Sequence, residues 1–192
     1  MPRIAEFAPW ALAERKQVAG LKAEIEQSIP FSTPWEEALL NLLRTADRFS
    51  HAMQCLIRPW GVTATQYNVL RILRGAGPDG LTCSEIGSRM LTADPDITRL
   101  LRRLKALKVI RQHRDRGDHR VVRTVISESG SRLLGEMDPA VKRAPELLLG
   151  HLSAGEIAEL TRLLERAREH CTDAQAESGQ EELFSGRMEK ES

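Results

Sequence analysis

The sequence is poor in aromatic side chains, which make up 4% of its 192 residues, and it has only three cysteines. Cys55, Cys83 and Cys171 are odd in number and far apart, so we expect neither a disulfide framework nor a zinc site. No apolar run approaches the roughly 18–20 residues that a membrane span needs. Residues 1–6 lack the apolar core of a signal peptide, so we expect a cytoplasmic protein.

Motifs that mark common enzyme classes are missing as well. The sequence has no Gly-rich phosphate loop, no Gly-x-Ser-x-Gly elbow and no His-Glu-x-x-His zinc motif. A catalytic pair assembled only by the fold leaves no such trace, and this alternative stays open. The sequence therefore favours a protein without enzymatic activity, metal or cofactor.

Long stretches of the chain have the apolar spacing of helices. Apolar residues recur every three or four positions over residues 11–25, 35–57, 133–149 and 154–167, which predicts an amphipathic helix in each. The third of these helices is expected to continue past two internal prolines. The last one follows a Ser-x-x-Glu capping box at Ser153.

Three shorter helices are predicted between the long ones, each with a clear start. Thr63 and Thr82 begin Thr-x-x-Gln and Thr-x-x-Glu capping boxes, in which two side chains satisfy free amides of the first turn. Asp94 before Pro95 is expected to cap the third short helix, with the proline at its first position.

The pattern changes after the third short helix. Residues 109–113 and 121–126 are rich in β-branched side chains and flank a polar loop, 114–120, with glycine near its middle. This pattern predicts a β-hairpin. Beyond it, residues 173–192 are dominated by Glu, Gln, Ser and Gly, which predicts a disordered acidic tail.

Charge is distributed unevenly, although the whole chain carries a net charge of only +1. Residues 99–123 contain ten Lys and Arg against two Asp, a local net charge of +8, so the remainder of the chain is net −7. A basic segment of this kind favours binding to phosphates, because each neutralised phosphate releases condensed counterions. The coincidence with a pair of short helices, a basic third helix and a hairpin makes DNA the expected partner.

The outward face of the third short helix carries most of the candidate DNA contacts. A helix fits the major groove, where base edges are distinguishable, so we expect Arg99 and Arg103 to reach guanine edges or phosphates. Thr98 is expected to contact a phosphate. Asp96 is expected either to accept from a cytosine amine or to compensate the helix dipole. Arg102 completes the set, with an ion pair or a solvated charge as its alternative.

The hairpin loop supplies the remaining candidates. Arg116 lies near the tip and is the expected minor-groove contact. Arg120 is a further candidate DNA contact. We also expect Asp118 and Arg120 to form an ion pair, either within the loop or with another element, through which Asp118 structures the wing.

Several of the few aromatic residues, together with one histidine, fall in one part of the sequence. Candidates for a ligand pocket are Trp35, Phe49, His51, Trp60 and Tyr67, all near the expected junction between the helices. Ordinary packing in the core is the alternative role for these side chains.

In this order and spacing the motifs resemble the multiple-antibiotic-resistance regulator (MarR) family. The matching stretch runs from about residue 35 to 170 and includes Leu-Thr-Cys-Ser-Glu-Ile-Gly at 81–87, Asp-Ile-Thr-Arg-Leu-Leu-Arg-Arg-Leu at 96–104 and Arg-Asp-Arg-Gly-Asp-His-Arg-Val-Val at 114–122. The resemblance implies a mainly α fold with a small β-hairpin wing, in which a winged helix-turn-helix is flanked by N- and C-terminal dimerisation helices.

This resemblance divides the chain into four parts. An N-terminal extension with one helix covers 1–34, dimerisation helices cover 35–62 and 127–172, the DNA-binding domain covers 63–126 and the tail follows. A homodimer would read a pseudo-palindromic operator, usually as a repressor, and a small aromatic effector would release it. The wide apolar stripes on the outer helices independently favour a two-fold dimer.

Two further hypotheses stay open. One is a winged-helix protein-interaction module whose basic wing meets an acidic partner without specific DNA binding. The other is a DNA-binding regulator that senses oxidants through Cys55 or Cys83.

Overall fold

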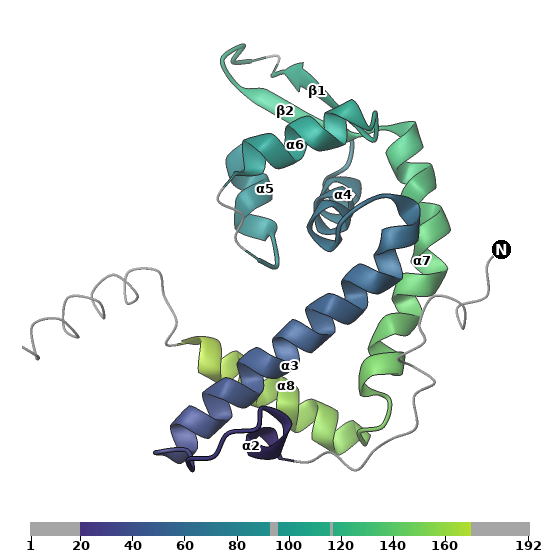
Figure 1. Cartoon of the computed structure of the whole chain (residues 1–192). Coiled ribbons are helices and arrows are strands. Elements are labelled where there is room, and N and C mark those ends of the chain that lie inside the picture. Colours follow the sequence, from purple (N-terminus) through teal and green to yellow (C-terminus); the bar gives the residue numbers. More distant parts are fainter. Residues whose placement is uncertain (1–19, 93–95, 116, 170–192) are drawn as a thin grey trace, which may run out of the picture. The chain divides into compact units, whose positions relative to one another are not determined.

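The computed structural model describes residues 20–92, 96–115 and 117–169. The chain divides into two compact units, the first ending at Leu148 and the second beginning at Leu149. The described residues form helices and one two-stranded antiparallel sheet, which confirms the expected mainly α fold with a β-hairpin (Figure 1). Within these ranges no helix combines the length and the apolar character needed to cross a membrane.

Several predicted features lie outside the described residues. They are the first part of the helix expected over 11–25, the expected cap at Asp94, Arg116, Cys171 and the tail at 173–192. Of the predicted N-terminal helix, the structure describes α2 (Leu21–Glu24).

The first long helix, α3 (Pro34–Ile57), has clear boundaries. The hydroxyl of Thr33 accepts a hydrogen bond from the Glu36 amide at 3.1 Å, and Pro34 occupies the first helical position, where no amide donor is needed. A short 3-10 turn, η2 (Arg58–Trp60), follows, and Gly61 then adopts a left-handed conformation that ends the helical path.

Three shorter helices follow: α4 (Ala64–Ala76), α5 (Cys83–Arg89) and α6 (Ile97–Ala106). Both predicted capping boxes are confirmed. The Thr63 and Thr82 hydroxyls each accept from the amide three residues on, and Gln66 and Glu85 accept from the two threonine amides in return.

The helix start that the structure describes differs from the expected one. α6 begins at Ile97 and its N-cap is Asp96, whose carboxylate accepts from the Arg99 amide at 2.8 Å. Aspartate caps a helix wherever its carboxylate reaches a free first-turn amide, and Asp96 meets that condition.

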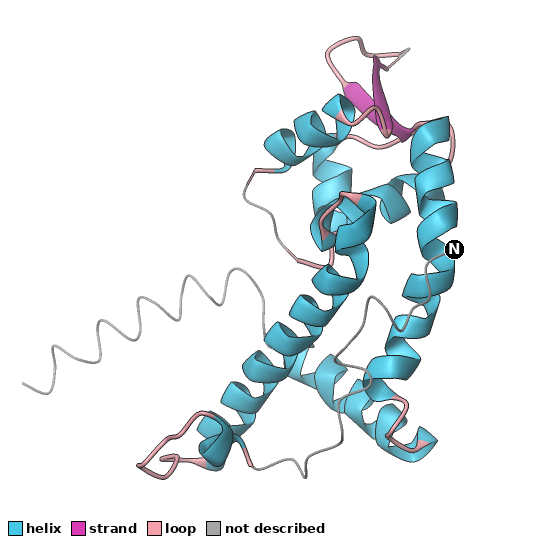
Figure 2. Ribbon diagram, turned by 45° about the vertical axis from the view of Figure 1, so that its right-hand side comes forward, coloured by secondary structure: helices cyan, strands magenta, loops and turns pink. Residues whose placement is uncertain are grey.

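The hairpin consists of β1 (Ile110–Arg114) and β2 (Val122–Ile126), drawn in magenta in Figure 2. The strands pair antiparallel, from Ile110 opposite Ile126 to Arg114 opposite Val122. The free edge of β2 is also paired: Leu81 and Thr124 exchange backbone hydrogen bonds of 2.9 and 2.7 Å. This isolated bridge ties the hairpin to the chain segment before α5.

Gly80 makes this edge pairing feasible. Its φ is +70°, and a Cβ atom there would lie 2.5 Å from the Thr124 carbonyl oxygen. Only glycine combines the positive φ with so close an approach to the neighbouring backbone.

The core of the first unit lies among α3, α4, α5, α6, the hairpin and α7 (Glu128–Leu149). β1 packs against α6, and β2 packs against α4 and α5. The largest fully buried side chains are Leu56, Ile57, Leu70, Leu73, Ile86, Leu104, Leu134, Met137, Val69 and Thr124. As predicted, α7 continues past Pro139 and Pro145.

The second unit contains α8 (Ala154–Glu169). Its predicted capping box is present: Ser153 Oγ accepts from the Glu156 amide at 3.3 Å, and the Glu156 carboxylate accepts from the Ser153 amide at 2.7 Å. Along the described length of α8 no residue is buried, and Leu160 and Leu163 stay exposed.

Candidate nucleic-acid interface

α6 presents a strongly two-sided surface. Leu100, Leu101 and Leu104 are buried in the core, while the side chains of Thr98, Arg99, Arg102 and Arg103 are all exposed. This is the division that the sequence predicts. The structure therefore gathers these four candidate contacts on the solvent side of one helix.

α6 approaches α5 closely where Ile97 faces Gly87. A Cβ atom on Gly87 would lie 2.6 Å from Cδ1 of Ile97, so a larger residue there would require the Ile97 side chain to shift. Asp96 has a structural role within α6, because its carboxylate accepts from the Arg99 amide and caps the helix. Its additional contact to a cytosine stays a prediction.

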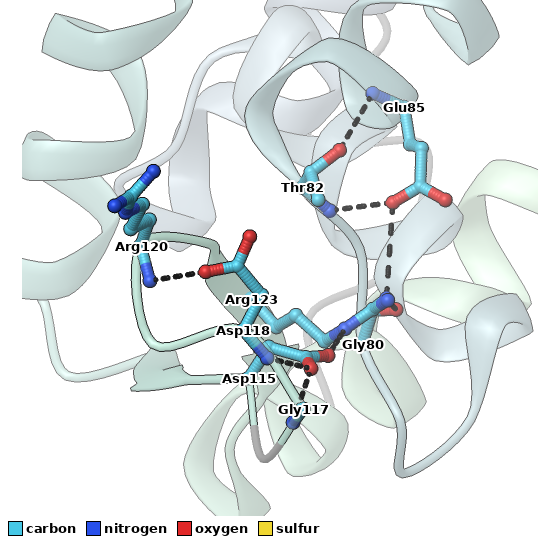
Figure 3. A network of polar contacts seen from close by, with 8 residues as sticks. All are labelled: Gly80, Thr82, Glu85, Asp115, Gly117, Asp118, Arg120 and Arg123. Atoms are coloured by element: carbon cyan, nitrogen blue, oxygen red, sulfur yellow. Dashed lines mark hydrogen bonds and ion pairs between the residues drawn. The ribbon is translucent and has the colours of Figure 1, made fainter.

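A network of polar contacts anchors the hairpin loop (Figure 3). The Asp115 carboxylate pairs with the Arg123 guanidinium and accepts from the amides of Gly117 at 2.8 Å and Asp118 at 3.2 Å. The Arg123 guanidinium, followed by these amides, lowers the pKa of Asp115 to about 2. The loop is therefore built around a carboxylate that stays ionised.

Arg123 also links the hairpin to the helices. Its guanidinium lies 3.9 Å from the Glu85 carboxylate and donates to the Gly80 carbonyl at 3.4 Å. Glu85 is itself the capping residue of α5, and the Thr82 amide and hydroxyl lower its pKa. One chain of contacts therefore runs from the start of α5 to the wing (Figure 3).

The expected ion pair between Asp118 and Arg120 was wrong. Asp118 accepts from the backbone amide of Arg120 at 2.9 Å, and the Arg120 guanidinium points away from that carboxylate in Figure 3. The loop's ion pair is instead Asp115–Arg123. Asp118 thus shapes the loop through the backbone, and the Arg120 side chain is exposed.

Sequence reasoning missed Asp115 and Arg123 as wing-structuring residues. The signal for Asp115 was present, since an Asp two residues before Gly117 is typical of a side chain that accepts from its own turn. Arg123 carried no such local signal, because its partner is eight residues away across the hairpin.

The candidate ligand-pocket residues do not all come together. Trp35, at the start of α3, is 82% exposed, and at 1.5 Å per helical residue it lies about 20 Å along the helix from Phe49. His51 is exposed, with Nε2 3.5 Å from Cys55 Sγ. Trp35 thus shares no cavity with Phe49 inside one protomer.

Trp60 and Tyr67, in contrast, lie in or against the hydrophobic core. Trp60 packs half-buried against the core that includes Tyr67, which is buried. The Arg71 guanidinium carbon lies 6.0 Å from the centre of the Tyr67 ring, within reach of a weak cation–π contact. Burial raises the pKa of Tyr67.

A cleft of about 390 Å³ lies between α6 and the hairpin. It is lined by Cys83, Thr98, Leu101, Arg102, Lys105, Gln112, Val122 and Thr124. The Cys83 thiol is exposed there, whereas Cys55 on α3 is half-buried. In the part of the chain that is described, no three His, Cys, Asp or Glu side chains gather in a way that could hold a metal ion.

Comparison with known proteins gives one consistent family. Residues 60–121 match the family model described as the MarR family. Among curated relatives, the transcriptional repressor NicR of Pseudomonas putida is 31% identical over 138 residues, which cover 70% of this chain and 86% of NicR. The regulator TtmR of Methylorubrum extorquens is 38% identical over 93 residues, 48% of this chain and 47% of TtmR, so that match spans about half of the relative.

Solved structures agree. A MarR transcription factor from Planctomyces limnophilus has 37% identity and a TM-score of 0.55, with 71% of this chain and 98% of that one covered. BpsR of Bordetella bronchiseptica is similar in fold at 24% identity, with a TM-score of 0.64, and the match covers 72% of this chain and 97% of BpsR. The BpsR structure is described as showing a mechanism for regulation of its DNA binding by 6-hydroxynicotinic acid. This chain belongs to the MarR family of winged helix-turn-helix transcription regulators.

Proposed function

We propose that this regulator binds double-stranded DNA sequence-specifically as a homodimer on a pseudo-palindromic operator, and that it acts as a repressor. The observation that carries the proposal is the exposed face of α6, where Thr98, Arg99, Arg102 and Arg103 point to solvent beside an anchored hairpin. The repressor NicR and the DNA-binding BpsR, with which the chain shares sequence or fold, support the same function.

In this proposal α6 enters the major groove. Arg99 and Arg103 read guanine edges or phosphates, Arg102 and Thr98 contact phosphates, and Asp96 accepts from a cytosine amine next to the helix start. The hairpin loop, with Arg116 and Arg120, contacts the adjacent minor groove or backbone. The 63–126 segment is thus the DNA-binding domain.

Dimerisation is proposed from exposed apolar surface. On α3, Trp35 is 82% exposed, and Leu39, Leu42 and Leu43 lie on the same side of the helix and are exposed as well. On α8, Leu160 and Leu163 are exposed. An exposed apolar face on each helix marks an interaction site, so we propose that 35–62 and 127–172 form the dimer and that 1–34 is an N-terminal extension with one helix.

We further propose that a small aromatic ligand releases the DNA. BpsR, similar in fold, is described with 6-hydroxynicotinic acid as a regulator of its DNA binding. Trp60 and Tyr67, packed where α3 meets α4, are the aromatic residues of the candidate set that fit such a pocket, with Phe49 and His51 on the adjoining helix. Trp35 could join them only from the partner subunit of a dimer.

Selection of bound sequences from a random duplex pool at about 0.15 M salt tests the function directly. We expect one palindromic family of sites whose half-sites lie about 34 Å, or one helical turn, apart. Equal affinity for every duplex would instead support the protein-interaction module. A selected site without symmetry would contradict the dimer.

A matched pair of variants then tests the recognition helix. Arg103→Ala should weaken binding to the selected site by about 1–3 kcal/mol and relax its base preference at one position. Arg143→Ala, which removes an exposed arginine from α7 outside the apolar faces assigned to the dimer, should bind like the wild type, and sedimentation equilibrium checks that each variant has the same oligomeric state as the wild type. Equal weakening of Arg103→Ala on all duplexes would reassign Arg103 to a phosphate.

A further inference from the structure

A second basic surface lies at the other end of α6 from its cap. A pocket of about 440 Å³ forms where the end of α6, the strand β1 and the start of α7 meet. Four cations line it, Lys105, Lys108, Arg111 and Arg132, which we call the α6–α7 basic cluster. Arg132 lies outside the basic run of residues 99–123 and joins the other three only because α7 begins beside β1.

The backbone at Lys108 holds the cluster in place. Lys108 has a φ of +59°, a left-handed conformation that glycine or asparagine adopts more easily. Its carbonyl accepts from the hydroxyls of Ser127 at 2.8 Å and Ser129 at 2.6 Å, and its amide donates to the Lys105 carbonyl at 2.9 Å. Lys108 follows the C-cap of α6, where a left-handed residue commonly ends a helix, and these bonds fix the point at which its side chain leaves the backbone.

The charges of the cluster are not neutralised by ion pairs. Across the described ranges, none of its four cations forms an ion pair, in contrast to Arg123, which pairs with Asp115 in the wing. Glu128 is the single carboxylate in the lining. Four cations around one carboxylate leave a surface that attracts an anion.

We propose that the α6–α7 basic cluster binds a phosphate of the DNA backbone and so extends the interface of the proposed function, on which this inference rests. Lys105 lines both this pocket and the cleft between α6 and the hairpin, so the two surfaces are continuous. α6 has 10 residues and is about 15 Å long, close to the roughly 12 Å width of the major groove. The end of a helix seated there meets the backbone that borders the groove.

The exposure of the cluster favours a backbone phosphate over an enclosed small ligand. All four cationic side chains are exposed, so a bound anion keeps one side in solvent, as a phosphodiester does. The buried and half-buried hydroxyls of the lining, Ser127 and Ser129, already donate to the Lys108 carbonyl.

The salt dependence of binding to a duplex of random sequence tests this proposal in the full-length chain. The plot of log K against log salt has a negative slope, and Arg132→Gln and Lys108→Asn should each reduce its magnitude by up to about 0.9 per bound protomer, the value for one phosphate contact. For the loss of one whole contact, the factor by which affinity falls between 50 and 200 mM salt becomes about three- to fourfold smaller. Asparagine tolerates the left-handed backbone, so Lys108→Asn keeps the turn.

Arg143→Gln is the matched control, because it removes an equally exposed arginine from the same helix, three turns further on. Its slope should equal that of the wild type, with sedimentation equilibrium showing the same oligomeric state for the wild type and all three variants. If all three variants keep the wild-type slope, the cluster is not part of the interface, although the proposed function survives. If the wild type itself does not bind duplex DNA, both proposals fail.

Titration with inorganic phosphate, followed by NMR, distinguishes the source of the anion. Millimolar phosphate that shifts the Lys108 and Arg132 signals, while both variants keep the wild-type slope on DNA, would reassign the cluster to a small anion and overturn the proposal. Reduced slopes in Arg132→Gln and Lys108→Asn, with an unchanged Arg143→Gln, support the backbone contact.

Discussion

The winged-helix lobe, residues 63–126, and the long helix α3 use their leucines in opposite ways. In α6, Leu104 is fully buried, and Leu100 and Leu101 are at most 6% exposed. In the first half of α3, Leu39 and Leu43 are more than half exposed. Both helices are amphipathic, yet among the described residues of the first unit neighbouring elements cover the apolar face of α6 and leave that of the first half of α3 exposed. Helical periodicity therefore identifies an apolar face without saying whether the same chain covers it.

The arginines of the lobe divide in a similar way. Arg123 is held in the wing network by Asp115 and reaches Glu85 and Gly80, whereas Arg99, Arg102 and Arg103 extend into solvent from α6. A high local charge thus combines residues that build the fold with residues that are available to a partner. Only the latter count toward an interface.

The largest effect is expected from truncating a buried leucine. Leu104→Ala should lower the free energy of unfolding by about 2–5 kcal/mol, because it removes a fully buried side chain and leaves a cavity. Leu39→Ala should stay within about 0.5 kcal/mol at concentrations where the chain is monomeric. Urea unfolding of both variants measures the difference. Equal losses would show that the face of α3 is covered within one chain.

A charge on the exposed face of α3 should act on association instead of folding. Leu39→Asp should raise the dimer dissociation constant by at least about thirtyfold, or 2 kcal/mol, because it places a carboxylate in an apolar contact. Asn41→Asp is the control, since Asn41 lies on the opposite side of the same helix. Sedimentation equilibrium gives both constants, and circular dichroism checks that the helices persist. An unchanged constant for Leu39→Asp would remove this face from the dimer.

Loss of a helix cap in the lobe should have a smaller effect. Thr82→Ala should destabilise the fold by about 1 kcal/mol, because the Glu85 amide loses its acceptor at the start of α5. Ser84→Ala, an exposed position in the same first turn, should be close to neutral. Thermal or urea unfolding resolves the two. A neutral Thr82→Ala would mean that solvent replaces the cap without cost.

The smallest effect concerns the pH dependence of the wing. The folded-state pKa of Asp115 lies at about 2, below the ordinary value of 3.8, so its stabilising contribution is present above pH 3.8 and is lost as the pH falls through about 2. An NMR titration of the Asp115 carboxyl carbon should show this low midpoint. In Arg123→Gln the midpoint should rise toward 3.8, because Arg123 is the largest cause of the shift. A midpoint that does not move would assign the effect to the loop amides.

Much of the fold was predictable because its signals are local. The capping boxes at Thr63, Thr82 and Ser153 each involve residues three apart, and the hairpin and the helix past Pro139 also follow from short patterns. Predictions failed where two neighbours offered similar local chemistry. Asp94 and Asp96 are both good caps in sequence, but the α6 described here uses Asp96.

The candidate site was predictable in its outline and less so in its details. The outward residues of α6 follow from helical periodicity and are exposed as expected. The wing ion pair was assigned to the wrong residues because Asp118 and Arg120 are close in sequence, whereas Arg123 reaches Asp115 only once the strands have paired.

By itself the sequence determined the order of the elements, most of their starting signals, the apolar faces and the family. These depend on residues within a few positions of one another, where helix and strand geometry determines which side chains share a face. Only the tertiary structure decided which arginines are held internally, why Gly80 must lack a side chain, and that Arg132 lies beside Lys105 and Lys108. Those outcomes require segments distant in sequence to pack together, and local periodicity carries no information about that packing.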